Sequence, residues 1–111
     1  MDHEAIGAET EAVPDVNLAQ MAAGEEMSVQ HFHIEPGATV PAHDHHYEQA
    51  GFIYQGELTF LLADSEVIVS AGESYVLAGD ERHGAENRGD VPVHGVDIFA
   101  PPRTDPDWAD D

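Results

Sequence analysis

The segment GATVPAHDHHYEQAGFIYQG, residues 37–56, decides how the rest of the chain is interpreted. Its centre holds three histidines, His43, His45 and His46, followed by Glu48 and Gln49. On an extended strand alternate residues share one face, so His43, His45 and Gln49 can point at one spot. Neutral imidazole is the commonest metal ligand in proteins. This spacing therefore predicts a site for a single metal ion.

A second segment, GESYVLAGDERHGAEN at residues 72–87, supplies a further imidazole. His83 follows a turn predicted at Gly79-Asp80, because glycine and aspartate are frequent turn residues. Between the two segments, the apolar runs on either side of residues 63–65 predict a hairpin. We therefore expect His83 to be a further candidate ligand, supplied from a distant part of the chain.

Together, the two segments resemble the two motifs of the cupin superfamily. The first keeps the spacing G-x5-H-x-H-x3-Q-x6-G, with Gln49 where that motif usually has glutamate. The second keeps the spacing from Gly72 to His83 and on to Asn87. The resemblance covers roughly residues 25–100 and implies an all-β fold, a double-stranded β-helix or jelly-roll barrel.

The resemblance makes three imidazoles and one amide oxygen the predicted metal ligands: His43, His45, Gln49 and His83. Such a set suits one divalent transition metal ion, and Zn, Ni, Fe, Mn and Cu all stay open. Because Gln49 is neutral, the ion keeps its full charge. That favours Lewis-acid chemistry over the carboxylate-containing sites of non-haem iron oxygenases. A β-bulge at this point would instead place Glu48 on the metal.

A second alternating histidine pair, His31 and His33, lies in a strand predicted over residues 27–35. One interpretation is that the pair supplies extra metal ligands. The interpretation that we favour is a strand face with polar or half-buried imidazoles, because four other ligands already complete a site. Either histidine could still line the cavity of the barrel.

The composition limits the possible partners. The chain has 111 residues, enough for one domain, and no cysteine, so disulfides and thiolate metal sites are excluded. It has 23 acidic residues, three arginines and no lysine, and its net charge is −20. Nucleic acid is not an expected partner, because phosphates are bound by Lys and Arg. We expect the acidic surface of a salt-adapted protein; an acidic protein from an ordinary cell is the alternative.

The N-terminal residues show neither the basic region nor the apolar core of a signal peptide. No apolar run reaches the ~18–20 residues that a membrane-spanning helix needs. We therefore expect a cytoplasmic protein without a membrane partner.

Turn residues recur every 8–12 positions or so, which predicts about eight short strands and no helix. We assign an acidic N-terminal arm with a first short strand to residues 1–24, the barrel to residues 25–100, and an extended acidic tail to residues 101–111. Within the arm, residues 1–14 are expected to be loose. Residues 39–45 are expected to form the strand that carries the first two ligands.

The last predicted strand ends in DIFAPPR, residues 97–103. If the face shared by Asp97 and Phe99 lines the cavity, a carboxylate lies near the metal, where a general acid or base is expected. With the ligand set, this run resembles the KdgF-type cupins, which linearise 4,5-unsaturated uronates. The resemblance implies active-site roles for Asp97, Phe99 and Arg103, with Arg103 holding the substrate carboxylate. The alternative is a surface carboxylate and an ordinary strand exit.

The resemblance thus implies a metal-dependent enzyme that opens and ketonises an anionic sugar. Two other classes stay open. One is a metal-dependent cupin of another reaction class, such as a dioxygenase or an isomerase. The other is a non-catalytic module that binds a small molecule. The resemblance also implies a homodimer that packs sheet on sheet.

Overall fold

The computed structural model describes residues 1–103, so the predicted tail from residue 104 onward lies outside the described residues. The described part of the chain forms ten β-strands and no α-helix: β1 (Thr10–Val13), β2 (Val16–Ala23), β3 (Ser28–Ile34), β4 (Thr39–His43), β5 (Glu48–Gln55), β6 (Glu57–Leu62), β7 (Glu66–Ser70), β8 (Ser74–Leu77), β9 (His83–Glu86) and β10 (Val93–Ala100). No helix in residues 1–103 is long and apolar enough to span a membrane. The all-β prediction is confirmed.

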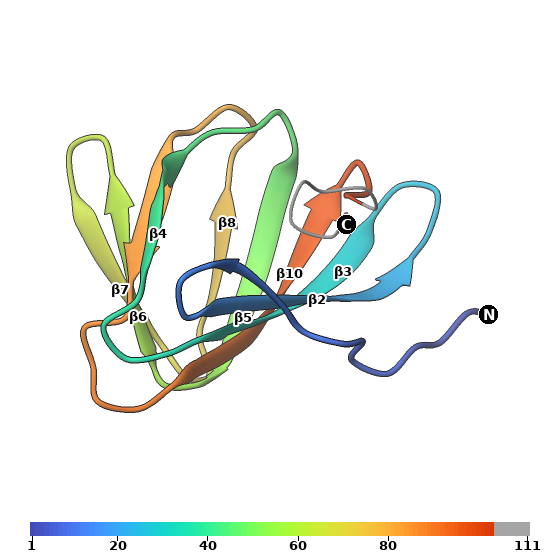
Figure 1. The fold of residues 1–111 in the computed structure, drawn as a ribbon. Helices are drawn as coiled ribbons and strands as arrows, with labels where there is room; N and C mark the ends of the chain where they lie inside the picture. The colour runs from blue at the N-terminus through green and yellow to red at the C-terminus, as the bar shows by residue number, and fades with distance from the viewer. Residues whose placement is uncertain (104–111) are drawn as a thin grey trace.

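The strands form two antiparallel sheets that enclose a common core (Figure 1). The larger sheet has the order β1-β2-β3-β10-β5-β8, and the smaller sheet has the order β4-β9-β6-β7. The chain crosses from the smaller to the larger sheet between β4 and β5, and back again between β5 and β6. Such repeated crossing is the arrangement of a jelly-roll barrel, and it places the histidine-rich segment where the chain passes between the sheets.

The N-terminal arm contains a strand that the sequence did not predict. Strand β1 pairs with β2 through a turn at Asp15, whose φ of 64° lies in the left-handed region that aspartate tolerates. The backbone N–H of Asp15 donates to the carboxylate of Glu11 at 2.8 Å. The expectation of a loose arm was therefore wrong for residues 10–13. Their order comes from pairing with β2, which a local pattern does not show.

The strand predicted over residues 39–45 is shorter than expected. It ends at His43, because the chain must leave the smaller sheet to reach the larger one, and His45 lies in that crossing. Gln49 lies on β5, in the other sheet. The argument that alternation on one strand aligns these three side chains was therefore wrong. Strand β9, which begins at His83, was not predicted either.

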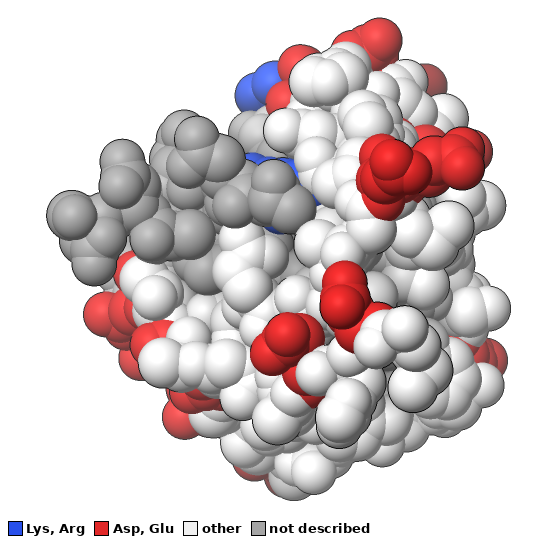
Figure 2. Space-filling view, turned by 90° about the vertical axis from the view of Figure 1, so that its right-hand side faces the viewer, with Lys and Arg blue, Asp and Glu red and all other residues white. Residues whose placement is uncertain are grey.

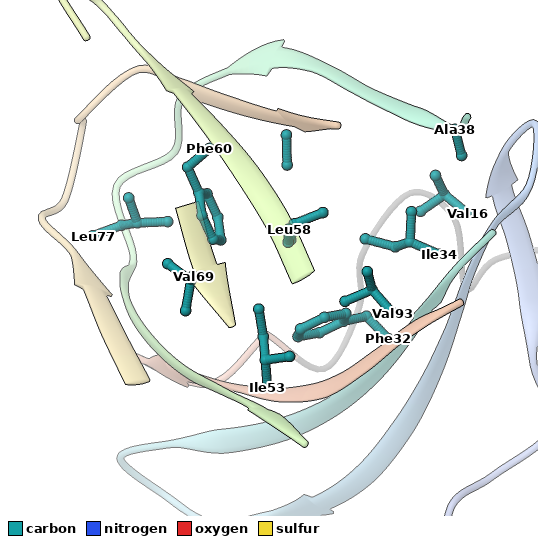
Figure 3. Close-up of a cluster of buried hydrophobic side chains, with 11 residues drawn as sticks. Val16, Phe32, Ile34, Ala38, Ile53, Leu58, Phe60, Val69, Leu77 and Val93 are labelled. Atoms are coloured by element: carbon teal, nitrogen blue, oxygen red, sulfur yellow. The ribbon is translucent and has the colours of Figure 1, made fainter. Parts of the chain in front are cut away.

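The core consists of apolar side chains that point inward from both sheets (Figure 3). Its buried members are Val16, Phe32, Ile34, Ala38, Ile53, Leu58, Phe60, Val69, Leu77, Ala85 and Val93. Burying one large apolar side chain contributes about 1.5–3 kcal/mol. This core therefore supplies the main stabilisation of a chain whose acidic surface repels itself.

The register of the larger sheet arranges its inward side chains in rows that run across the strands. One row is apolar apart from a glycine: Leu18, Phe32, Gly95 and Ile53. The next row carries polar groups: Gln30, Asp97, Gly51 and Tyr75. A third row contains Ser28, Phe99, Gln49 and Leu77. The polar row thus lies directly beside the apolar core.

On the face shown in Figure 2 the acidic residues form several separate clusters among uncharged residues, with few basic groups beside them. Two of the three arginines take part in exposed ion pairs. Arg88 pairs with Glu66 and Glu86, and an Arg82 nitrogen lies 3.6 Å from an Asp44 carboxylate oxygen. Such exposed pairs contribute little to stability.

Candidate metal centre and cavity

Three histidines converge where β4 and β9 lie next to the crossing into β5. His43 and His83 are direct partners in the antiparallel pairing of β4 with β9, and His45 approaches them from the crossing. One ring nitrogen from each lies within 4.8 Å of the other two. His83 is buried, whereas His43 and His45 are half-buried. The fold therefore assembles a compact set of three imidazoles from two segments.

Each of these rings is held by its second nitrogen. The Nδ1 atoms of His43, His45 and His83 lie 2.9, 3.2 and 2.8 Å from backbone carbonyl oxygens of residues two positions away in sequence. Because a carbonyl can only accept, each Nδ1 carries the proton, and each Nε2 keeps a free lone pair. This tautomer and orientation are those of metal-binding histidines.

Gln49 completes the set from the larger sheet. It is 7% exposed, and its Oε1 lies 3.1 Å from the Nε2 of His45. With its proton on Nδ1, His45 presents a lone pair to the Gln49 oxygen, so two acceptors face each other. A cation beside them, bound by both atoms, would satisfy both. The neighbouring Glu48 is exposed, so the geometry favours Gln49 over Glu48 as the fourth ligand.

The electrostatics of the site agree with metal binding. Burial is the largest effect that lowers the pKa of His45 and of His83 below the ordinary value, so both imidazoles are neutral at neutral pH. Neutral imidazole is the form that binds a metal. The residues present therefore fit a divalent transition metal ion, and the donor set does not select one element.

A cavity of about 330 Å³ opens beside the histidines. Its polar wall consists of His43, His83, Gln49, Asp97, Tyr75, Gln30 and Arg103. The remainder is mostly apolar and includes Leu18, Phe32, Leu58 and Phe60. A volume of this size, with few polar groups on an apolar wall, is typical of a small-molecule site.

Asp97 faces this cavity from β10 and is 6% exposed. Burial raises its pKa to about 6, although hydrogen bonds from Tyr75 and Gln49 and the charge of Arg103 act to lower it. The Tyr75 hydroxyl donates a hydrogen bond to the Asp97 carboxylate. A carboxyl group with this pKa can both take up and release a proton near neutral pH.

The contact between Tyr75 and Asp97 depends on Gly51. The two side chains come from β8 and β10, and Gly51 lies opposite both of them on the intervening strand β5. A Cβ atom at residue 51 would lie 2.1 Å from the Tyr75 ring and 2.5 Å from the Asp97 carboxylate. The missing side chain therefore lets the tyrosine reach across β5.

Arg103 lies at the same cavity, just after β10. Its backbone N–H donates to the Ser28 hydroxyl at 2.7 Å, and its guanidinium carbon lies 5.3 Å from the Phe99 ring centre and 5.8 Å from that of Tyr47. Two aromatic rings thus support the guanidinium. Of the three arginines, Arg103 is the one on the cavity wall.

The structure brings most of the predicted site residues to one place. His43, His83, Gln49, Asp97, Phe99 and Arg103 line the cavity, and His45 adjoins it. His31 and His33 are not among the lining residues. Tyr75, Tyr47 and Gln30 were missed. Tyr75 reaches Asp97 across β5, and Gln30 lies beside Asp97 through the pairing of β3 with β10, and a local sequence pattern marks neither.

Comparison with known proteins agrees with this geometry. The sequence pattern of the family described as Cupin domain matches residues 30–99, which is more than half of the chain. The chain therefore belongs to the cupin family. A curated protein of Bacillus subtilis named H2HPP isomerase is 34% identical over 67 residues, which cover 60% of this chain and 28% of that protein. The chain thus spans little more than a quarter of that relative's length.

Solved structures show the same fold. KdgF from Halomonas sp. has a TM-score of 0.80 at 22% identity, covering 88% of this chain and 91% of that chain. An RmlC-like cupin from Shewanella frigidimarina has a TM-score of 0.82 at 19% identity, covering 95% and 96%. A predicted oxalate decarboxylase from Thermotoga maritima has a TM-score of 0.75 at 18% identity, covering 90% and 98%. At these identities the likeness shows the fold alone.

Proposed function

We propose that this cupin is a metal-dependent enzyme that linearises 4,5-unsaturated uronate monosaccharides. The observation that carries the proposal is the placement of Asp97 and Arg103 on one cavity wall beside the three histidines. A uronate offers a carboxylate for the guanidinium and hydroxyl groups for the metal centre and the proton-transfer residue. The likeness in fold to KdgF supports the same assignment.

The reaction needs a proton to move between two atoms of the substrate. The anomeric O–H bond breaks, the bond from C1 to the ring oxygen breaks, and an aldehyde forms at C1 with an enolate at C5. A proton added at C4 then turns the enolate into a ketone. The product is an isomer of the substrate, so no oxidant or reductant is required.

Asp97 is the residue that we assign to this proton transfer. Its carboxylate accepts the anomeric proton, and the carboxylic acid returns a proton to C4. Tyr75 holds the carboxyl group in place, because burial and the nearby carboxylate raise the tyrosine pKa and keep its hydroxyl a donor. Positioning of both partners in a cavity of about 330 Å³ lowers the entropic barrier.

The metal would be held by His43, His45, His83 and Gln49. A divalent ion there supplies Lewis-acid polarisation of substrate oxygens. Arg103 orients the substrate through its carboxylate, preferably with two parallel hydrogen bonds. The Phe99 and Tyr47 rings beside the guanidinium limit its movement.

The test is turnover of unsaturated galacturonate by the metal-loaded protein in high salt, followed by loss of the ultraviolet absorbance of the conjugated double bond. We expect turnover well above the spontaneous rate, and a loss of at least about 100-fold in Asp97→Asn. Asp90→Asn, in an exposed turn, is the matched control and should retain the full rate. Metal-bound protein with no turnover above the spontaneous rate would refute the proposal.

A second candidate function is isomerisation of a small carboxylate with an apolar ring. The apolar part of the cavity wall favours it, as does the partial match to the protein named H2HPP isomerase. Carboxylates with an apolar ring and no ring hydroxyl are the probes for this candidate. Turnover of such a compound that requires Asp97, in a protein inactive on unsaturated galacturonate, would favour the second candidate.

The homodimer stays a prediction. Phe52, Val76 and Ile98 expose apolar surface on the outer face of the larger sheet, which supports sheet-on-sheet packing. Light scattering should give twice the monomer mass for the wild type and the monomer mass for Ile98→Glu. A monomeric wild type would contradict the prediction.

A further inference from the structure

Gln30 is a polar residue of the cavity wall that the proposed reaction leaves unused. It lies on β3, points inward and is 4% exposed. Its carbonyl oxygen Oε1 is buried and has no hydrogen-bond partner among residues 1–103. Gln30 is thus a buried polar side chain on a ligand cavity with an unmet hydrogen bond.

An unpaired buried amide oxygen destabilises a folded protein. Methionine has nearly the same length and volume and would fill the position without leaving a polar atom unpaired. Most buried polar atoms in native proteins are paired, so an exception on a cavity wall suggests a partner that the chain itself does not supply.

The register of the larger sheet places Gln30 beside the reacting groups. Gln30 and Asp97 are direct partners in the pairing of β3 with β10, so their Cβ atoms are expected about 4.5–5.5 Å apart. The Arg103 guanidinium carbon lies 5.3 Å from the ring centre of Phe99, which follows Asp97 by two residues on the same face of β10. The proposed carboxylate-binding group, Asp97 and Gln30 therefore lie on one wall of the cavity.

We infer that Gln30 is a specificity-determining residue that hydrogen-bonds a ring hydroxyl of the substrate, so that the cavity selects hydroxylated ring acids. The inference rests on the proposed function, since it places the substrate carboxylate at Arg103 and the reacting atoms at Asp97. A hydroxyl group both donates and accepts, so it matches either end of an amide side chain. A site that hydrogen-bonds a hydroxyl discriminates against an analogue that lacks it, because the buried polar group is then left unpaired.

The experiment compares two ligands that the enzyme does not turn over. D-galacturonate carries a carboxylate and ring hydroxyls, whereas tetrahydropyran-2-carboxylate has the carboxylate and ring but no hydroxyl. Titration calorimetry on the metal-loaded protein in high salt gives both affinities. We expect Gln30→Met to weaken galacturonate binding by about tenfold, the size of one well-placed hydrogen bond, and to change tetrahydropyran-2-carboxylate binding less than about twofold.

The matched control is Gln55→Met. Gln55 is exposed at the end of β5 and is not among the cavity-lining residues, so the same substitution there should leave both affinities unchanged. Thermal unfolding of the ligand-free variants provides a second readout. Gln30→Met should melt at or above the wild-type temperature, because an unpaired oxygen has been removed.

Three results would overturn the inference. The first is that Gln30→Met lowers the affinity for both ligands equally. The second is that this variant binds galacturonate as tightly as the wild type does. The third is that the wild type binds galacturonate no more tightly than tetrahydropyran-2-carboxylate. The turnover assay is separate. A protein that prefers galacturonate through Gln30 but does not open unsaturated galacturonate refutes the proposed reaction and leaves this inference standing. Turnover without that preference refutes the inference alone.

Discussion

Two clusters of three histidines lie on opposite sides of the barrel wall, and they are built in the same way. In each cluster, two of the histidines are two positions apart in sequence. One of these two is the direct strand partner of the third histidine, which lies on the neighbouring strand. The inner cluster is His43, His45 and His83. The outer cluster is His31, His33 and His94.

The clusters differ in how their rings are held. In the inner cluster the rings of His43 and His83 meet at 60°, with centroids 4.5 Å apart, and backbone carbonyls hold every Nδ1. In the outer cluster the rings of His33 and His94 are stacked at 19°, with centroids 4.3 Å apart. Stacked rings direct their nitrogens side by side, whereas tilted rings can direct them to a common point.

Three nitrogens of the outer cluster have other partners, whereas the Nδ1 of His31 is buried without one in residues 1–103. His33 lies 3.0 Å from a Glu9 oxygen and 3.3 Å from a Glu35 oxygen, and the Nε2 of His31 lies 2.7 Å from the Tyr54 hydroxyl. Within residues 1–103, only the inner cluster brings three ligand atoms within 4.8 Å of one another. Spacing in sequence therefore does not define a metal site; the partners of the second ring nitrogen do.

The strongest test of this comparison is metal content. His83→Ala should weaken metal binding by more than about 100-fold, because changes to residues that only support ligands already weaken it by 10–100-fold. His94→Ala removes the equivalent histidine of the outer cluster and should leave binding unchanged. Elemental analysis after dialysis measures both. Equal loss of metal in the two variants would show that the clusters are not different.

Metal removal should lower stability through the inner cluster. At a free metal concentration 100 times the dissociation constant, binding contributes about 2.7 kcal/mol, or roughly 10 °C in the melting temperature of a domain of this size. A chelator should lower the melting temperature of the wild type and of His33→Ala by this amount. It should not change the melting temperature of His43→Ala, because that variant does not bind the metal. A chelator effect that persists in His43→Ala would place the metal elsewhere.

In metal-free protein acid should act on both clusters, because burial lowers the pKa of His45 and of His83 as well, and the outer cluster can be tested separately. Burial, and then the neighbouring histidines, lower the pKa of His31 and of His94 below 6.5, while Glu9 acts on both in the opposite direction. The unfolded chain therefore binds more protons than the folded chain below pH 6.5. Stability present at pH 7 is lost as the pH falls through this range.

His94→Gln should flatten this loss, measured as the difference in melting temperature between pH 7.5 and pH 5.5 on metal-free protein. His3→Gln, on the exposed N-terminal residues, is the control and should follow the wild type. An unchanged pH dependence in His94→Gln would show that the outer cluster does not titrate with folding.

Salt should affect the stability of the protein without distinguishing the two clusters, because the carboxylates that it screens are spread over the surface. The melting temperature of metal-free protein should rise between about 0.1 M and 2 M KCl, because the Debye length falls to a few ångströms and repulsion within a net charge of −20 is screened. The rise should be the same in His83→Ala and in His94→Ala. A melting temperature indifferent to salt would contradict the prediction of a salt-adapted protein.

Much of the fold was predictable because its signals are local. The hairpin of β6 and β7 around residues 63–65 follows from two alternating runs and a polar turn, and the chain returns there with the Leu62 N–H donating to the Ser65 carbonyl at 2.8 Å. The position of Gly56, whose φ is 85°, follows from the same logic, since only glycine adopts this conformation readily. Strand β1 was not predictable, because its order depends on a partner strand.

The sequence predicted which residues form the site, but not which structural elements carry them. The sequence named the residues that meet at the cavity, yet it placed His43, His45 and Gln49 on one strand, whereas they come from a strand end, a crossing and the opposite sheet. It offered no means to find Tyr75, which reaches Asp97 only because Gly51 lies between them.

The sequence by itself determined the barrel, the absence of thiolate chemistry and the identity of the candidate ligands, because turn residues, composition and motif spacing are properties of neighbouring positions. Only the tertiary structure decided which of the two histidine clusters forms a candidate metal site, and which polar side chains share its cavity. Ring orientation and cross-strand register are fixed by contacts between segments that are far apart along the chain.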